Sequence, residues 1–165
     1  MTAVPTTECP PRWLDDEQQQ IWRTYLRGVH HLNEYLDRAL RPFDLSLAEY
    51  EILVSLSEAD EHRLRMSDLA DAVHQSRSRL THTVGRMEKS GLIERVACPS
   101  DRRGVWAQLT PAGYDLLVTA APCHVESVRT ALVDAATPED FQALGRVFAE
   151  VLAVPDVSNG RSGQI

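Results

Sequence analysis

Six side chains that can donate hydrogen bonds lie close together in the chain, at positions that would share the outer face of one helix: Arg77, Ser78, Arg79, Thr81, His82 and Arg86. Leu80, Val84 and Met87 recur between them at helical spacing and would form the opposite, apolar face. Arginine, serine, threonine and histidine side chains suit phosphate oxygens and the edges of bases. This helix could therefore contact a nucleic acid, and the alternative is an ordinary solvated helix face.

A second group of charged side chains lies in a turn-rich segment further along the chain: Asp101, Arg102 and Arg103. This segment, 98–104, separates two stretches, 92–96 and 105–109, whose composition predicts strands. The strands would form a hairpin with the charged residues at its tip. A solvated turn is the alternative, but two adjacent arginines close to a basic helix favour a contact with DNA.

The charge of the chain is unevenly distributed. The 165 residues carry a formal net charge of −7, which by itself argues against a polyanionic partner. Residues 63–104, however, contain nine basic and five acidic residues, so this segment carries +4 and the remainder carries −11. A basic segment within an acidic chain is typical of a localised nucleic-acid contact.

The polar-fronted helix follows a shorter helix in the arrangement of a helix-turn-helix. Ser67 is expected to cap a short helix that ends at Val73, and a two-residue link leads to Ser76, which can cap the second helix. Gly91 can supply the left-handed residue that ends this second helix. The hairpin that follows would be a wing, so 46–110 is expected to form a winged helix-turn-helix lobe that binds DNA.

Long amphipathic helices are predicted on both sides of this lobe. From Trp13 to Leu40 the apolar residues keep helical spacing, and such a helix would be about 40 Å long. Because that length is large for so small a protein, we expect its apolar stripe to serve a partner subunit as well as its own core. A capping box begins the next helix at Ser46. Two later helices begin at Thr110 and Thr137, each of which precedes a proline.

Other segments are expected to depart from regular helix. The polar segment 57–65 predicts a connection, and Pro122 is expected to kink or interrupt the helix that begins at Thr110. Residues 1–12 are rich in proline and threonine and predict a disordered arm. Residues 155–165 predict a flexible tail.

Composition and motifs exclude several classes of protein. Hydrophobic residues make up 43% of the chain and charged residues 25%, as in ordinary globular proteins. No apolar run is long enough to cross a bilayer and the amino terminus carries no basic-then-apolar leader, so we expect a cytoplasmic protein with no membrane partner. The sequence has no G-x-S-x-G, no glycine-rich phosphate loop and no H-E-x-x-H, so we do not expect an enzyme.

Five short motifs occur in a consistent order between about Leu14 and Leu152: Ser67-Asp-Leu-Ala70, Leu80-Thr81, Gly91-Leu-Ile-Glu-Arg95, Asp101-Arg-Arg103 and Leu109-Thr-Pro-Ala-Gly113. This order resembles the MarR family of bacterial winged-helix regulators. The resemblance implies a mainly α fold with a small β-hairpin wing, in which a winged helix-turn-helix joins a helical dimerisation lobe. It assigns 13–45 and 111–154 to the dimerisation lobe.

The resemblance also implies a homodimeric transcriptional regulator, in the expected case a repressor, that binds a pseudo-palindromic operator in double-stranded DNA. In the recognition helix, the positions that touch bases in family members are Arg77, Ser78, Thr81 and His82. Arg79 lies beside them, and Arg86, further along, would meet phosphate. In the wing, Arg103 would enter the minor groove with Asp101 orienting it, and Arg102 would contact phosphate.

Members of the family commonly bind small aromatic or phenolic compounds in a cleft between the lobes, and the ligand disfavours the spacing that fits DNA. Candidate residues for such a small-molecule effector are Trp13, Trp22, Tyr25 and His30. The alternative is that they belong to the core, since aromatic residues at helical spacing are what a core helix needs. No cofactor is expected.

Thiol sensing and metal sensing on the same fold are alternatives. The three cysteines are far apart and form no C-x-x-C pair, so free thiols are expected: Cys9, Cys98 and Cys123. His30-His31 and Cys123-His124 could approach each other, but adjacent helix residues point about 100° apart, so only one of each pair could easily join a metal site. A winged helix that binds only other proteins is a further alternative, and the basic segment counts against it.

The expected role of the wing gives a first prediction. Replacing Arg103 by alanine should weaken operator binding at least about tenfold, because a charge-assisted contact is lost, while the dimer stays intact. A mobility-shift titration measures the affinity and gel filtration the assembly. Unchanged affinity would contradict the assignment of Arg103 to the DNA contact.

Overall fold

The computed structural model describes residues 11–97 and 104–155, which contain six α-helices and three β-strands. Their bounds are α1 (Asp16–Leu40), α2 (Leu47–Glu58), β1 (Arg63–Arg65), α3 (Met66–Ala72), α4 (Arg77–Lys89), β2 (Ile93–Ala97), β3 (Val105–Leu109), α5 (Pro111–Val128) and α6 (Pro138–Ala153). This is the mainly α fold with a small β-hairpin that the sequence predicts. The tip of the hairpin and most of the expected arm and tail lie outside the described ranges. None of the described helices is long and apolar enough to cross a membrane.

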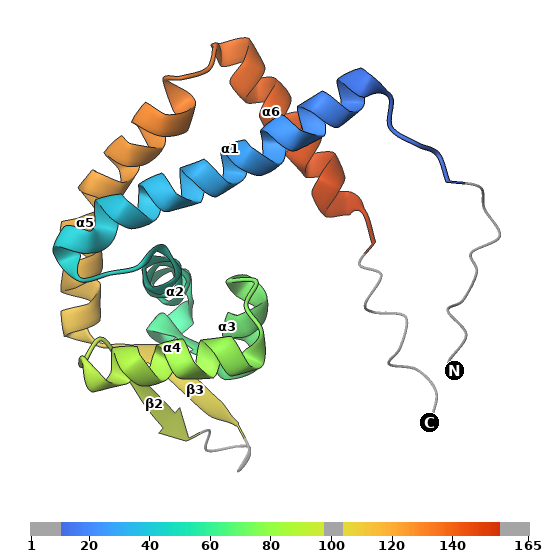
Figure 1. The fold of residues 1–165 in the computed structure, drawn as a ribbon. Coiled ribbons are helices and arrows are strands. Elements are labelled where there is room, and N and C mark those ends of the chain that lie inside the picture. Colours follow the sequence, from blue (N-terminus) through green and yellow to red (C-terminus); the bar gives the residue numbers. More distant parts are fainter. Residues whose placement is uncertain (1–10, 98–103, 156–165) are drawn as a thin grey trace, which may run out of the picture.

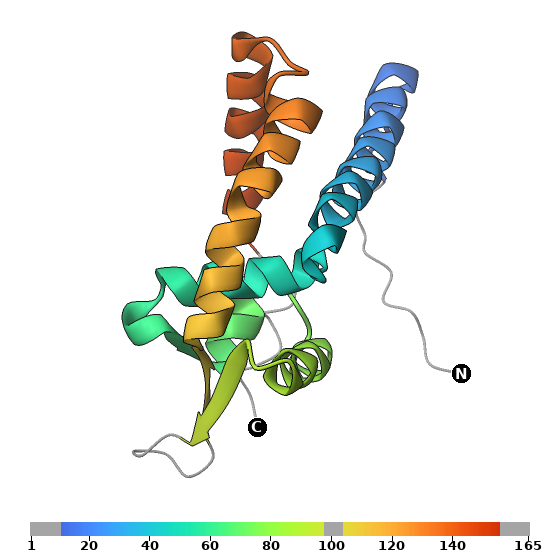
Figure 2. The same ribbon diagram turned by 90° about the vertical axis from the view of Figure 1, so that its left-hand side faces the viewer.

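The helices form two lobes (Figure 1). In the lower lobe α2, α3, α4 and the sheet surround one apolar core, which the first half of α5 also joins. Above it α1 and the arm formed by α5 and α6 diverge (Figure 2). Of the described residues, α1 buries only Leu36 and Leu40, and α6 buries none. The core therefore lies in the lower lobe, and the upper helices keep long apolar faces uncovered.

Side-chain caps fix where the helices begin. α1 was expected from Trp13 but begins at Asp16, because Asp15 and Gln18 form a capping box: Asp15 Oδ1 accepts from Gln18 N at 2.8 Å. The helix ends at Leu40, two residues before Pro42. Arg41 keeps right-handed helical angles, and a 3-10 turn, Arg41–Phe43, follows and contains the proline, so the expectation that the residue before Pro42 leaves the α conformation is wrong. The predicted caps at Ser46, Thr110 and Thr137 are all confirmed.

Two predictions around the third helix are wrong. Ser67 does not cap α3, because the helix already begins at Met66; the Ser67 hydroxyl donates instead to Asp68 Oδ1 at 2.9 Å. The segment 57–65 is not an irregular connection, since its end forms β1, which pairs antiparallel with β3. The sheet order is β1-β3-β2. A three-residue strand is too short to show alternation in the sequence.

The expected interruption of α5 at Pro122 does not occur. α5 continues to Val128 and is followed directly by a π-helical turn, Arg129–Val133. A proline removes only one backbone bond, and packing holds α5 in place on both sides of it. Ala120 is fully buried. Beyond the proline, the His124 ring packs on Tyr50 of α2 with 4.3 Å between ring centres, and burial lowers the pKa of His124.

The start of α5 lies very close to the turn after α4. Thr110 N donates to Leu92 O at 3.1 Å, and Thr110 Oγ1 donates to Gly91 O at 2.7 Å while accepting from Gly113 N at 3.0 Å. A Cβ at Gly113 would lie 2.2 Å from Leu92 O and 2.8 Å from Leu109 Cδ1. Only glycine leaves room for this approach, which explains the last residue of the Leu-Thr-Pro-Ala-Gly motif.

Replacing Gly113 by alanine should therefore destabilise the fold by about 1–3 kcal/mol, because the backbone of α5 must move away from Leu92. Thermal unfolding followed by circular dichroism measures the effect. Gly85→Ala in α4 is the matched control, since a Cβ there would meet only Arg95 Nη2 at an ordinary 3.8 Å. The control should be neutral or stabilising, and an equal loss in both variants would contradict the steric explanation.

Candidate nucleic-acid interface

Helix α4 is held by its apolar side. Leu80, Val84 and Met87 are buried, as their spacing predicts, and they belong to the same cluster as apolar residues of α2, α3 and α5. Thr83 is buried beside them, and its Oγ1 donates to Arg79 O at 3.1 Å. Because four neighbouring positions are anchored, the rotation of α4 about its own axis is fixed.

The opposite side of α4 faces solvent. All six donors singled out from the sequence are exposed: Arg77, Ser78, Arg79, Thr81, His82 and Arg86. Ser76 caps the helix as predicted, with its Oγ accepting from Arg79 N at 3.3 Å. Thr81 Oγ1 donates to Arg77 O at 2.7 Å, so its hydroxyl is oriented along the helix. The fold thus leaves all six predicted donors of α4 accessible to solvent.

The turn between α3 and α4 depends on a left-handed histidine. His74 has φ of 49°, while His74 N donates to Asp71 O at 3.2 Å and Gln75 N donates to Ala70 O at 3.0 Å. These two bonds close the end of α3 in the same way that Gly91, with φ of 73°, closes the end of α4. The two-residue link after Val73 was predicted, but the left-handed conformation of His74 was not, because glycine is usual at this position.

The base of the hairpin is tied to α4 by an ion pair. Arg95 of β2 donates from Nη2 and Nε to Glu88 Oε2 at 2.6 and 2.9 Å. These bonds from Arg95 lower the pKa of Glu88, so the carboxylate is ionised at neutral pH. The predicted contact residues at the tip lie outside the described residues: Asp101, Arg102 and Arg103.

Three arginines from separate elements surround a hollow of about 460 Å³ beside the first half of α4. Arg77 comes from α4, Arg95 from β2 and Arg65 from β1, and the hollow also reaches Ser67 and Thr81. Arginine and hydroxyl side chains around one hollow are suited to a phosphate oxygen. The basic surface therefore extends from α4 to the sheet.

Strand β1 carries two arginines that sequence analysis did not assign to the site, and one of them, Arg65, lines this hollow. Arg63 and Arg65 both lie over the ring of Trp106 in β3, at 5.2 and 5.5 Å from its centre. They face the same ring because β1 pairs with β3, with Arg65 opposite Trp106. The sequence signal was present only as two extra charges in the basic segment.

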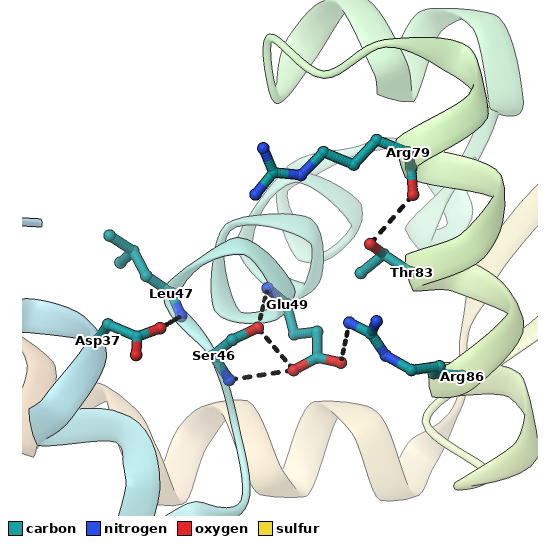
Figure 3. A network of polar contacts seen from close by, with 7 residues as sticks. All are labelled: Asp37, Ser46, Leu47, Glu49, Arg79, Thr83 and Arg86. Carbon is teal, nitrogen blue, oxygen red and sulfur yellow. Dashed lines mark hydrogen bonds and ion pairs between the residues drawn. The ribbon is translucent and has the colours of Figure 1, made fainter. Parts of the chain in front are cut away.

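Arg86 points towards α2 rather than along the outer surface (Figure 3). Its Nη2 donates to Glu49 Oε1 at 3.2 Å. Glu49 Oε2 accepts from Ser46 N at 3.0 Å and from Ser46 Oγ at 2.6 Å. Burial by itself raises the pKa of Glu49, but the bonds from Ser46 and Arg86 outweigh it and lower the pKa. Both oxygens of an ionised carboxylate are thus occupied within the protein.

A cavity of about 1010 Å³ lies between the upper and lower lobes, with α1, α2 and α4 around it. Of the candidate ligand residues, only His30 lines it. Trp13 and Trp22 line a smaller hollow of about 300 Å³ at the start of α1. Tyr25 stacks on Trp22, with 5.4 Å between ring centres, and also faces Phe148 of α6 at 6.0 Å. The structure of one chain does not gather these four residues into one pocket.

The residues considered for thiol or metal sensing are separated. Cys123 is exposed and its Sγ donates to Ala39 O at 3.5 Å, whereas the adjacent His124 packs on Tyr50. Within residues 11–97 and 104–155, no three His, Cys, Asp or Glu side chains are grouped in a way that could hold a metal ion. Cys9 and Cys98 lie outside these ranges.

Known proteins are similar to this chain in sequence and in fold. Residues 45–105 match the model of the MarR family. The regulator PecS of Dickeya dadantii is 30% identical over 120 residues, which is 72% of each chain. AbsC of Streptomyces coelicolor, a MarR family transcriptional regulator, is 45% identical with a TM-score of 0.81 over 88% of this chain and 100% of that chain. Sco3205 from the same organism, solved in complex with DNA, is 41% identical with a TM-score of 0.86 over 90% of this chain and 94% of that chain.

These matches extend beyond the winged lobe, because 90% of the chain superposes on Sco3205. The relatives are regulators of transcription. Identity of 45% to AbsC over that whole chain is far above what a shared fold alone would give. The chain described here therefore belongs to the MarR family of transcriptional regulators.

Proposed function

We propose that this protein is a sequence-specific DNA-binding regulator, which represses genes whose promoters overlap its operator. The observation that carries the proposal is the exposed row of donors on α4, opposite the buried Leu80, Val84 and Met87. The complex of the related Sco3205 with DNA supports the same partner for this chain. The +4 charge of residues 63–104 supports it as well.

In this proposal the first two turns of α4 enter the major groove. Arg77 can bind a guanine through two parallel hydrogen bonds, and Ser78, Thr81 and His82 can each donate to or accept from base edges. Arg79 would contact the backbone. Arg102 would contact the backbone and Arg103 would enter the minor groove, as the resemblance to the MarR family implies.

Replacing Arg77 by alanine should lower affinity for the preferred operator at least about tenfold and affinity for unrelated duplex DNA much less, because a base contact carries specificity. The operator is first selected from random duplexes with the purified protein, and fluorescence anisotropy then measures affinity at fixed salt. Arg129→Ala is the control, since Arg129 is in the upper lobe and bonds Asp134 at 2.8 Å.

Failure to enrich any pseudo-palindromic site would count against the proposed function. If no duplex were bound in a salt-dependent way, a winged helix that contacts only other proteins would be favoured instead. A reporter promoter that overlaps the operator gives the sign of regulation: lower expression supports repression, and higher expression would indicate activation.

We propose further that the protein works as a homodimer assembled through α1, α5 and α6. The supporting observation is that these helices carry large apolar side chains that one chain leaves exposed, such as Ile21, Val147 and Val151, at 63%, 58% and 56%. Apolar area of this extent on adjoining helices marks a protein interface. Two symmetric winged lobes would match the two halves of a pseudo-palindrome.

Introducing a charge at Val147→Glu should weaken the dimer at least about tenfold, because a carboxylate would be buried against apolar side chains. Sedimentation velocity over a concentration series measures the dissociation. Gln142→Glu, also exposed on α6, is the control and should leave the dimer intact. A wild-type protein that sediments as a monomer at all concentrations would contradict the proposed assembly.

The cavity between the lobes is the place where we propose that a small aromatic or phenolic effector binds. Its lining is strongly polar and contains four arginines, three carboxylates and a histidine: Arg38, Arg41, Arg79, Arg86, Glu34, Asp37, Glu51 and His30. This chemistry favours a phenolic compound that carries a carboxylate over a purely apolar ring. Titration of the DNA complex with phenolic acids, followed by anisotropy, tests whether such compounds release the DNA.

A further inference from the structure

A continuous polar chain of contacts links the recognition helix to the first helix of the upper lobe (Figure 3). It runs from Arg86 in α4 to Glu49 in α2, through the cap residue Ser46 to Leu47, and on to Asp37 in α1. We propose that Arg86 is a positioning residue: through Glu49 it fixes the angle of α4 relative to α1, and so the spacing of the two recognition helices. This inference rests on the proposed function.

The Glu49 carboxylate is the anchored partner of the pair. The Glu49 side chain is only 16% exposed, whereas that of Arg86 is 65% exposed, so the buried partner determines where the arginine lies. Glu49 is itself held by two bonds from Ser46, at 3.0 and 2.6 Å, and cannot follow Arg86 outward without breaking the capping box of α2. The arginine is therefore attached to a rigid anchor.

The start of α2 is bonded to α1 of the upper lobe. Leu47 N, the first amide of α2, donates to Asp37 Oδ1 at 2.9 Å. Asp37 lies in the last turn of α1, one turn before the buried Leu40, so this bond fixes the start of α2 on the end of α1. The same few residues at the start of α2 thus bond both α1 and α4.

The polar contacts from Arg86 to Asp37 lie beside the cavity between the lobes. Asp37, Ser46, Leu47 and Arg86 all line the cavity between the lobes. Apart from the apolar packing of the lower lobe, the polar chain is a direct route by which a change in the angle of α1 would be passed to α4. A contact that sets spacing must lie between the element that binds DNA and the element that sets the dimer, and this one does.

The inference separates Arg86 from the other basic residues of α4. A phosphate contact contributes to the salt dependence of binding, because it releases a counterion, whereas a positioning residue changes affinity without changing that dependence. If Arg86 contacts a phosphate, removing the negative charge of Glu49 should raise the affinity for DNA. If Arg86 is a positioning residue, the same change should lower that affinity.

Glu49→Gln tests this difference with little disturbance, because glutamine can still accept from Ser46 N and keep the capping box, yet has no charge for Arg86. Arg86→Met removes the other half of the pair at an exposed position. Each single variant should bind the selected operator at least about fivefold more weakly than the wild type. The double variant should bind at most about twofold more weakly than either single variant. The salt slope, which is the slope of log affinity against log salt concentration, should stay that of the wild type.

Arg79→Met is the matched control on the same helix. As a proposed backbone contact it should reduce the salt slope by about one. All variants are first checked for folding and dimer formation by circular dichroism and sedimentation. If Glu49→Gln did not fold, Arg86→Met and Arg86→Lys would still decide, since lysine keeps the charge and should partly restore affinity at an unchanged slope.

Operators whose half-sites are moved apart or together by one base pair supply a second readout. The wild type should prefer one spacing, and Glu49→Gln and Arg86→Met should flatten that preference, whereas a general loss of stability would weaken all spacings equally. A slope reduced by about one in Arg86→Met, or tighter binding by Glu49→Gln, would overturn the inference. If the wild type itself bound no DNA, the proposed function would fail, and not this inference alone.

Discussion

The burial of Leu80, Val84 and Met87 in the lower core is the interaction on which the rest of the interface depends. An α-helix turns by a fixed angle per residue, so placing these three side chains inward, with Thr83 beside them, leaves Arg77, Ser78, Arg79, Thr81 and His82 exposed to solvent. The caps at both ends then fix the position of the helix along its axis, because Ser76 begins it and Gly91 ends it. The exposure of the polar side of α4 thus depends on apolar packing on its other side.

The two lobes differ in how far one chain buries their apolar side chains. The lower lobe buries its apolar side chains within one chain, and the close contact of Gly113 with Leu92 joins α5 directly to the turn after α4. In the upper lobe α6 buries no side chain, and α1 buries only those of its last turns. Such helices are stable only against another surface. The geometry that α4 adopts towards DNA therefore depends on how the upper helices are covered, and the contacts that join α1 to α2 become as important as those of α4.

The sequence predicted the parts of this fold that follow local rules. Helical spacing, the capping box at Ser46 and the turn residue Gly91 each act over a few neighbouring residues, and each was found where expected. The strand Arg63–Arg65 was missed because it is defined by pairing with β3, more than forty residues away. Ser67 was misassigned as a cap because α3 starts one residue earlier, where β1 ends. The bond from Arg86 to Glu49 spans 37 residues and could not be inferred from either local pattern.

Ion pairs within the protein reduce the number of positive charges in the basic segment that are available to a phosphate. Arg63, Arg86 and Arg95 each form an ion pair with a glutamate, namely Glu61, Glu49 and Glu88. An arginine held by a carboxylate inside the protein has to break that bond before it can neutralise a phosphate fully. The number of phosphates that the protein neutralises should then be smaller than its count of basic residues, and the salt dependence of binding should be correspondingly shallow. The pairs of Arg86 and Arg95 bond α4 to α2 and to the sheet, whereas Arg77 and Arg79 are exposed at the start of α4.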